Sequence, residues 1–242
     1  MEKIIIVGAG LCGTLLALRM AQRGYEVVVF EKRPDQRNSE FLGGRSINLA
    51  LSNRGLQALE MVGFKEEILK DCIPMHGRMI HPLNGESWNS PYSGRAQDYI
   101  NSVSREELNM SLLEAADQFD NLTVHFEVKV THVDIEHARV NYQDKNGQAQ
   151  IEEAAVVIGT DGAGSAVRKS LMGQTTRLLF NYSQDFLRHG YKELSIDPAE
   201  GGGFKILKNA LHIWPRGQFM ICLLYTSPSP RDQRGSRMPS SA

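Results

Sequence analysis

The residues with the clearest chemical meaning form a glycine-rich segment near the N-terminus. Gly8, Gly10 and Gly13 fit the spacing G-x-G-x-x-G, directly after an apolar run and before a stretch suited to a helix. In this pattern the first glycine permits a tight turn, the second lets a pyrophosphate approach the backbone, and the third allows a helix to pack closely on a strand. The N-terminus of such a helix also attracts anions. The segment therefore predicts a dinucleotide site.

An acidic residue narrows the choice of nucleotide. Glu31 ends the next apolar run, 23 residues after Gly8, close to the distance expected for an acid that accepts hydrogen bonds from ribose hydroxyls. A carboxylate there repels a 2′-phosphate, which argues against NADP in this pocket and leaves FAD and NAD both open. A purely structural turn with a surface glutamate is disfavoured because strand, spacing and acid agree.

A second polar segment, TDGAGSAVR at 160–168, follows an apolar run at 154–158 that predicts a buried strand. Asp161 would then stand at the carboxyl end of that strand, where open α/β sheets bind ligands. It could accept hydrogen bonds from a polyhydroxylated chain such as the ribityl of a flavin, or it could only begin the helix for which Ser165 is a candidate N-cap. The sequence leaves both interpretations open.

The elements that must position these residues follow from periodicity. Runs at 3–8 and 26–31, joined by a helix that closes at Gly24, predict a right-handed βαβ unit with parallel strands. The predicted fold class is α/β, a doubly wound, Rossmann-like nucleotide-binding domain interrupted by a β-rich insert at 72–103 and by another that starts near 176.

Other signals divide the rest of the chain. Turn pairs at Asn84-Gly85 and Ser93-Gly94 predict hairpins, Ser104 is a candidate N-cap, and alternation through 121–153 predicts antiparallel strands. Short strands are expected at 190–196, 202–207, 210–214 and 218–223. The expected parts are 1–71 and 104–175 (the nucleotide-binding framework), 72–103 (a β-rich insert), 176–222 (the start of a second β-rich part) and 223–242 (a non-native disordered tail).

Composition excludes several classes of function. The 242 residues carry 27 basic and 28 acidic side chains, so no nucleic-acid partner is expected. Three cysteines without a C-x-x-C pair argue against a disulfide framework and favour the cytoplasm. No membrane segment is expected, because no apolar run approaches the roughly 20 residues of a spanning helix. No metal site is expected without an H-E-x-x-H pattern, and Ser165 lacks the G-x-S-x-G setting of a hydrolase.

The last twenty residues differ sharply in composition. From Leu223 the chain is rich in Ser, Pro and Arg and has no apolar periodicity. We expect the native reading frame to end near Cys222 and the remainder to be non-native.

Longer motifs add a family resemblance. The glycine motif, Glu31 and the segment 160–168 resemble the FAD-dependent aromatic-ring monooxygenases, the class A flavoprotein hydroxylases. The runs at 44–60, 73–81, 103–109, 182–194 and 211–220 resemble the branch of that family that hydroxylates L-kynurenine. The resemblance implies a Rossmann-like FAD-binding domain (1–71 and 104–175) with an interleaved β-rich substrate domain (72–103 and the sheet starting at 176–222) that is incomplete at the C-terminus. It also implies a role for two sets of residues. Those matching substrate contacts are Arg78 and Tyr92, and those matching FAD contacts are Cys12, Phe30, Glu31, Lys32, Arg33, Ala50, Arg105, Val130 and Asp161.

The resemblance also implies an activity. FAD would be bound, NADPH would be the co-substrate, and O2 would supply the oxygen added to L-kynurenine in tryptophan catabolism. Arg78 offers a planar fork of donors for an amino-acid carboxylate, and the Tyr92 hydroxyl can add a hydrogen bond. No proton-transfer catalyst is identified. Because the family's later motifs have no counterpart, we expect this fragment alone to bind FAD weakly and to turn over poorly. A non-catalytic FAD or NAD module and a hydroxylase of another aromatic substrate remain open.

Overall fold

The computed structural model describes residues 1–37, 48–95, 97–174, 178–190, 192, 196, 199–200 and 203–224. The chain divides into two compact units. Unit 1 comprises Met1–Ser46, Ala58–Phe64 and Arg105–Leu194, and unit 2 comprises Ile47–Gln57, Lys65–Ser104 and Ser195–Ala242.

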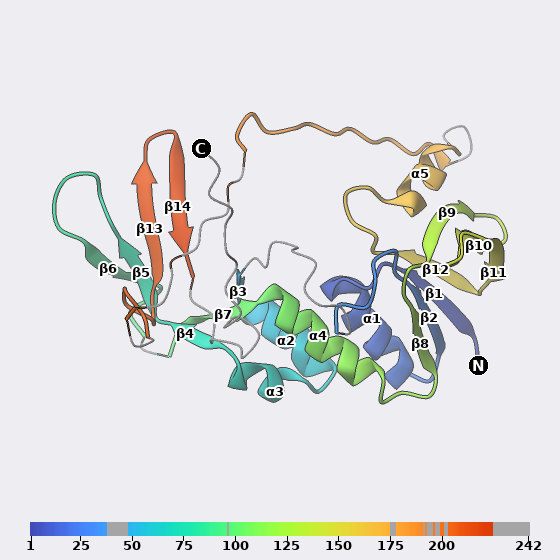
Figure 1. Ribbon diagram of the computed structural model, residues 1–242, viewed down its shortest axis with the longest axis horizontal. Helices are drawn as coiled ribbons and strands as arrows, with labels where there is room; N and C mark the ends of the chain where they lie inside the picture. The colour runs from blue at the N-terminus through green and yellow to red at the C-terminus, as the bar shows by residue number, and fades with distance from the viewer. Residues whose placement is uncertain are drawn as a thin grey trace. The chain divides into compact units, whose positions relative to one another are not determined.

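The described elements alternate between strands and helices in the first part of the chain and become strand-rich later (Figure 1). The helices are α1 (Leu11–Gln22), α2 (Asn53–Met61), α3 (Lys65–Lys70), α4 (Arg105–Ala116) and α5 (Ala166–Met172). The strands are β1 (Lys3–Val7), β2 (Glu26–Phe30), β3 (Asn48–Leu51), β4 (Ile73–Met75), β5 (Gly77–Ile80), β6 (Trp88–Pro91), β7 (Ile100–Ser104), β8 (Leu122–His125), β9 (Lys129–Asp134), β10 (Arg139–Gln143), β11 (Ala149–Glu153), β12 (Val156–Gly159), β13 (Leu211–Arg216) and β14 (Phe219–Leu223).

Unit 1 is built on a parallel sheet in the order β12-β1-β2-β8. The predicted βαβ unit is confirmed, because β1 and β2 pair in parallel and α1 connects them. Gly24, at a φ of +85°, directly follows the C-cap of α1 in the left-handed conformation that glycine adopts most readily. The Rossmann-like α/β fold therefore stands where the sequence placed it.

The two faces of this sheet are covered by different layers (Figure 1). Side chains on one face of the sheet, which include Ile5, Val28 and Phe30, form a core with valines of β9 and β10. The alternate residues of the same strands, such as Ile6 and Val29, are fully buried. Because side chains alternate along a strand, they must point to the opposite face, on the side of α1 and α4. Helices thus cover one face, and the antiparallel sheet β11-β10-β9 covers the other.

Unit 2 contains two further sheets. One has the order β14-β13-β5-β6 and the other the order β3-β7-β4. The hairpin predicted at Asn84-Gly85 is confirmed, since β5 and β6 pair antiparallel across it and Gly85 has a φ of +102°. The strands predicted at 210–214 and 218–223 are also confirmed as β13 and β14, which pair antiparallel.

Four expectations about strands were wrong. The turn at Ser93-Gly94 does not make a hairpin, because β6 and β7 belong to different sheets. The two or three antiparallel strands predicted within 121–153 are confirmed as β9, β10 and β11, but the first part of that segment, β8, pairs in parallel with β2. Strand β12 is an edge strand on which Val156 is 48% exposed, so it is not buried. Residues 203–207 form no strand. Apolar runs show that a segment can pair but not which neighbour it will find.

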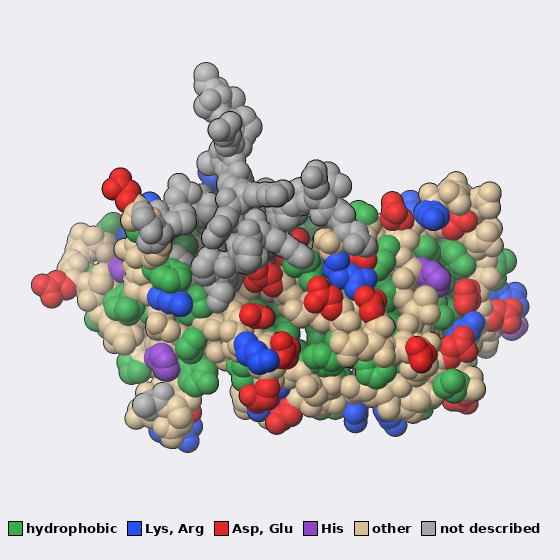
Figure 2. Space-filling model, turned by 60° about the horizontal axis from the view of Figure 1, so that its bottom comes forward, with side chains coloured by type: hydrophobic (Ala, Val, Ile, Leu, Met, Phe, Trp, Pro, Cys, Tyr) green, Lys and Arg blue, Asp and Glu red, His purple; other side chains and the backbone are tan. Residues whose placement is uncertain are grey.

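Some expectations concern residues outside the described ones. The predicted loop 34–45 is described only to residue 37, the strand 190–196 only in part, and the tail 223–242 only at its first two residues. The five-part domain division stays a prediction. Among the described residues, none of the helices combines the length and apolar character needed to span a bilayer. On the face drawn in Figure 2, acidic and basic side chains are interspersed.

Candidate functional site

The three motif glycines play different parts in the turn between β1 and α1. Gly8 has a φ of +102°, and a Cβ there would lie 2.8 Å from the carbonyl oxygen of Thr160. A Cβ on Gly13 would lie 1.9 Å from the carbonyl oxygen of Gly8. A Cβ on Gly10 would meet nothing within 4 Å. Gly8 and Gly13 are therefore required by packing, whereas Gly10 faces open space that a ligand could occupy.

The N-terminus of α1 has the features of an anion-binding site. Gly10 is the N-cap, no side chain caps the helix, and the first turn holds no acidic residue. The first N–H groups of a helix have no partner within it, and they carry partial positive charge. Cys12 lies in this turn with an exposed side chain. This arrangement suits the pyrophosphate that the sequence predicts.

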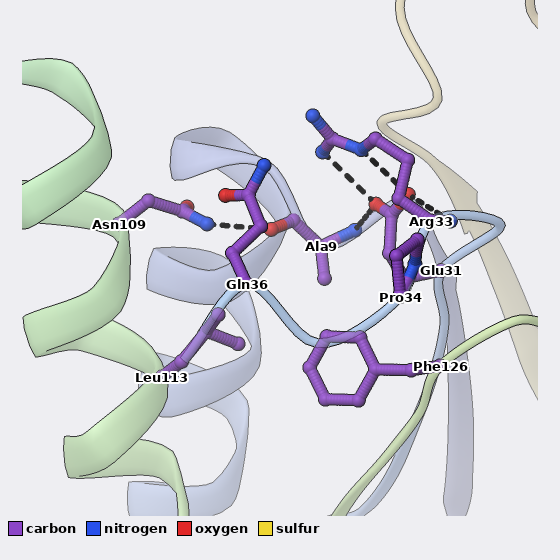
Figure 3. Close-up of a pocket in the computed structure, with 8 residues that line it drawn as sticks. All are labelled: Ala9, Glu31, Arg33, Pro34, Gln36, Asn109, Leu113 and Phe126. Carbon is purple, nitrogen blue, oxygen red and sulfur yellow. Dashed lines mark hydrogen bonds and ion pairs between the residues drawn. The ribbon is translucent and has the colours of Figure 1, made fainter. Parts of the chain in front are cut away.

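Glu31 is buried at the carboxyl end of β2, with 5% of its surface exposed. Its carboxylate accepts bonds of 2.9 Å from the Ala9 N–H, the Arg33 N–H and the Arg33 Nε, and one of 3.3 Å from Arg33 Nη2 (Figure 3). Burial by itself would raise the pKa of Glu31, but the bonds from Arg33 and Ala9 outweigh it and hold the pKa below its usual range. The residue is thus a preformed carboxylate.

Asp161 lies beside Gly8 at the same edge of the sheet. The Thr160 hydroxyl donates to the carbonyl oxygens of Val7 and Gly8, both at 2.9 Å, and a Cβ on Gly8 would lie 3.0 Å from the Asp161 Cα. Because β1 and β12 are parallel neighbours, both polar segments leave the sheet at its carboxyl end. The two segments singled out in the sequence therefore share one site.

The Asp161 carboxylate also begins a helix. It accepts bonds of 2.6 Å from the Ser165 hydroxyl and the Ala166 N–H at the start of α5. Ser165 caps α5 as predicted, because its Oγ accepts from the Arg168 N–H at 2.9 Å. The helix-start interpretation of Asp161 is thus realised, and its role toward a ribityl chain stays a prediction.

Two pockets flank this edge. The first, of about 10 Å³, is lined by Ala9, Glu31, Arg33, Pro34, Gln36, Asn109, Leu113 and Phe126 (Figure 3). The second, of about 400 Å³, is lined by Asp161, Gly162 and Ser165 together with residues of β12 and α5. The predicted ribose acid and the predicted ribityl acid therefore each line a pocket.

The other residues matched to FAD contacts differ in their burial and in the unit to which they belong. Phe30 is 2% exposed and its ring packs against Tyr142, with centroids 4.5 Å apart, so only its backbone could meet a ligand. Lys32 is exposed, Arg105 is the exposed first residue of α4, and Val130 is buried in β9. Ala50 is an exposed residue of β3 in unit 2. All of these assignments stay predictions.

The two residues matched to substrate contacts do lie together in unit 2. The Arg78 guanidinium sits 4.5 Å from the centroid of the Tyr92 ring. The Tyr92 hydroxyl is buried without a hydrogen-bond partner among the described residues. Burial raises the pKa of Tyr92, so the phenol keeps its proton near neutrality. The pair offers a cation and a hydroxyl donor side by side, which suits a carboxylate.

A histidine pair, which the sequence did not predict, stabilises one end of the same sheet. His81 Nε2 and His212 Nδ1 are 2.9 Å apart, and His212 Nε2 lies 2.8 Å from the Leu207 carbonyl oxygen. The His81 ring stacks on Trp214 with centroids 4.4 Å apart. Burial, with His212 and Arg216 nearby, lowers the pKa of His81. The described residues hold no group of three or more side chains able to bind a metal ion.

Two residues of the edge were missed by sequence reasoning. Thr160 joins the turns after β1 and β12, and Asn109, from α4, donates its Nδ2 to the Ala9 carbonyl oxygen at 3.2 Å. Asn109 lies one helical turn after Arg105, so the only available signal was a polar residue on a helix whose neighbours are apolar.

Comparison with known proteins assigns this geometry to a family. The family model described as FAD binding domain matches residues 1–180. The chain belongs to that family. FAD is therefore its cofactor, and the open space at Gly10 with the uncapped start of α1 fits the pyrophosphate of that dinucleotide.

Relatives of known name are similar over most of the chain. The chain is 46% identical to kynurenine 3-monooxygenase of Myxococcus xanthus over 92% of its own length and 48% of that protein. It is 43% identical to the Anopheles gambiae enzyme of the same name, over 91% of its length and 45% of the relative. The chain thus spans about half the length of the curated relatives it matches.

Solved structures support the fold. p-Nitrophenol 4-monooxygenase of Pseudomonas putida is similar with a TM-score of 0.60 and 23% identity, over 71% of this chain and 44% of that one. The Pseudomonas aeruginosa protein PqsL, described as a probable FAD-dependent monooxygenase, gives a TM-score of 0.61 and 22% identity over 88% of this chain and 53% of that one. At this identity the likeness concerns the fold.

Proposed function

We propose that this chain supplies the FAD site and part of the substrate site for the hydroxylation of L-kynurenine at the 3-position, with NADPH and O2 as co-substrates. The observation that carries the proposal is the 46% identity to a kynurenine 3-monooxygenase over 224 residues, which include both units. When bound, FAD supplies electron transfer from NADPH and activation of O2. The residues of the chain would bind FAD, orient the substrate and shield the site from water.

The FAD-binding part of the proposal uses the edge of unit 1. The first turn of α1 would hold the pyrophosphate, Glu31 the ribose hydroxyls, and Asp161 the ribityl chain. The lowered pKa of Glu31 keeps it an acceptor at neutral pH. NADPH, whose 2′-phosphate this carboxylate would repel, would reach the flavin from elsewhere.

The substrate part of the proposal uses Arg78 and Tyr92. Arg78 would pair with the α-carboxylate of the amino-acid substrate, and the unpartnered Tyr92 hydroxyl would donate a hydrogen bond to it. An arginine positioned over an aromatic ring loses less freedom when it binds a carboxylate than a free arginine does. The pair positions substrate and transfers no proton.

Two measurements test the proposal. The purified chain is mixed with FAD and followed by flavin fluorescence, and L-kynurenine is then added with NADPH and O2 while NADPH oxidation and 3-hydroxykynurenine are quantified. Because the chain spans about half of its relatives, we expect weak FAD binding and slow, kynurenine-dependent formation of product. Binding of NAD but not FAD, or NADPH oxidation that kynurenine does not change, would contradict it.

A matched pair of variants and a second substrate sharpen the result. Arg78→Lys keeps the charge but removes the fork, and should raise KM for kynurenine about tenfold with little change in FAD binding. Arg95→Lys is the control, because Arg95 is an exposed arginine of the same unit paired with Asp98. A PqsL structure is a complex with 2-aminobenzoylacetate; preference for that compound over kynurenine would favour another aromatic substrate.

The three cysteines also bear on location. Cys12, Cys72 and Cys222 are all free thiols, which fits a reducing compartment, and we propose the cytoplasm. Burial raises the pKa of Cys72 to about 11, so that thiol stays protonated and inert there.

A further inference from the structure

Asn109 presents a buried hydrogen-bond acceptor that nothing in the described chain uses. The residue is 8% exposed, and its Oδ1 has no partner among the described residues. Buried side-chain acceptors are nearly always satisfied in folded proteins, because leaving one unpaired costs about 1–3 kcal/mol. An unsatisfied atom of this kind, in a pocket, points to a group that the described residues do not supply.

The orientation of the amide follows from its other contact. Asn109 Nδ2 lies 3.2 Å from the carbonyl oxygen of Ala9 (Figure 3). Reversing the amide would place two oxygens against each other at that distance, so Nδ2 must be the atom that meets Ala9. Oδ1 is therefore the free atom, and Asn109 lines the same pocket as Glu31.

Glu31 cannot serve a ribose diol alone. Its two oxygens already receive four donors, one from Ala9 and three from Arg33, and a carboxylate offers about four lone-pair sites. A ribose carries two adjacent hydroxyls, each with a proton to donate. One hydroxyl could share a Glu31 oxygen, and the other would need a further acceptor.

We infer that Asn109 Oδ1 accepts a hydrogen bond from one ribose hydroxyl of the adenosine half of the dinucleotide, while its Nδ2 holds the Ala9 peptide in place. Ala9 is then fixed from both sides, since its N–H donates to Glu31 and its carbonyl accepts from Asn109. The pocket volume of about 10 Å³ admits a single hydroxyl or water rather than a sugar, so the ribose itself would lie at the mouth. The inference deepens the FAD-binding part of the proposed function and rests on it.

The test compares ligands that differ by one hydroxyl. ADP, 2′-deoxy-ADP and 3′-deoxy-ADP are titrated by calorimetry into the wild-type chain and into Asn109→Ala. In the wild type, loss of the hydroxyl that Asn109 accepts should weaken binding about five- to tenfold. In Asn109→Ala that same loss should change binding less than twofold, because the partner is already gone.

Gln36→Ala is the matched control, because Gln36 is the other amide lining this pocket. It should leave the ratio of ADP to deoxy-ADP affinity as in the wild type. Ratios within each variant cancel any general loss of stability, and thermal unfolding of the unliganded variants measures that loss separately. FAD titrated into the same variants should weaken in parallel with ADP.

The outcomes separate this inference from the proposed function. Equal hydroxyl dependence in the wild type and Asn109→Ala would overturn the inference and leave a purely structural asparagine that binds water. If neither ADP nor FAD binds the wild-type chain, both fall. If ADP binding shows the expected dependence but kynurenine has no effect, only the proposed function falls.

Discussion

The edge of unit 1 and the Arg78–Tyr92 region of unit 2 differ in how far their polar groups are satisfied. In unit 1 the Glu31 and Asp161 carboxylates and the Thr160 hydroxyl all have partners within the chain, and Asn109 Oδ1 is the one buried polar side-chain atom of its described residues that lacks one. In unit 2 the hydroxyls of Tyr92 and Ser102 and the Asn101 amide nitrogen are buried without partners among the described residues. The cofactor edge is therefore largely prebuilt, whereas the Arg78–Tyr92 region holds a buried hydroxyl whose partner the described residues do not supply.

This difference has a physical reason. A helix N-terminus and three tightly packed glycines form their binding geometry by local folding, because backbone N–H groups and close packing need no distant partner. A side chain that must meet a substrate keeps its donor free until the substrate arrives. Changes at the internally packed or bonded groups of unit 1, such as Gly13 and Glu31, should therefore mainly alter stability, and changes at Tyr92 should mainly alter binding.

The largest expected effect separates two glycines of the same turn. Gly13→Ala should lower the free energy of unfolding by about 3 kcal/mol, because the new Cβ would lie 1.9 Å from the Gly8 carbonyl oxygen. Gly10→Ala should lower it by no more than about 1 kcal/mol while abolishing FAD binding, because it fills the space left for the ligand. Urea unfolding and FAD titration of both variants measure this. Equal stability of the two would remove the distinction.

The next effect concerns the preformed carboxylate. Glu31→Gln should lower the free energy of unfolding by about 2 kcal/mol, because an amide group cannot accept all four donated bonds. Glu153→Gln is the control, since the Glu153 side chain is 64% exposed and its pair with Arg139 lies on the surface. Urea unfolding of both variants gives the comparison. A Glu31 variant as stable as the control would show that the hydrogen bonds to this carboxylate do not stabilise the fold.

The two units should respond to acid in different pH ranges. The pKa of His81 is lowered from its usual 6.5, so the unfolded chain takes up that proton first and unit 2 loses stability as the pH falls below about 6.5. The pKa of Glu31 is lowered from 4.5, so its contribution is present above that value and is lost only at lower pH.

Tryptophan fluorescence can follow the first of these transitions. Both tryptophans, Trp88 and Trp214, belong to unit 2, so their emission reports that unit. We expect unfolding by urea to need less denaturant at pH 5.5 than at pH 7.5, and His81→Asn to reduce the difference. Unchanged pH dependence in that variant would contradict the role of the histidine pair.

The smallest expected effect on stability belongs to Tyr92. Tyr92→Phe removes a buried hydroxyl that has no described partner and should change the free energy of unfolding by less than about 0.5 kcal/mol. If the comparison between the regions holds, the same change should weaken kynurenine binding several-fold. Calorimetric titration with kynurenine and urea unfolding of the one variant test both halves. A large loss of stability would show that the hydroxyl is structural.

The sequence by itself determined the βαβ unit, the parallel pairing of β1 with β2, and the location of the glycine turn and Glu31. These depend on local periodicity and on residues close together in the chain, such as Gly8 and Gly13. It also identified the Asp161 segment, because a polar run that follows an apolar strand is visible without a structure.

Only the tertiary structure decided which strands became neighbours and which side chains met across the chain. Strand β8 joined the parallel sheet, Asn109 reached Ala9, and His81 found His212 131 residues away. Such contacts depend on packing between segments that no short-range pattern relates. A single unpaired oxygen on Asn109 became visible only when the donors and acceptors around it could be counted.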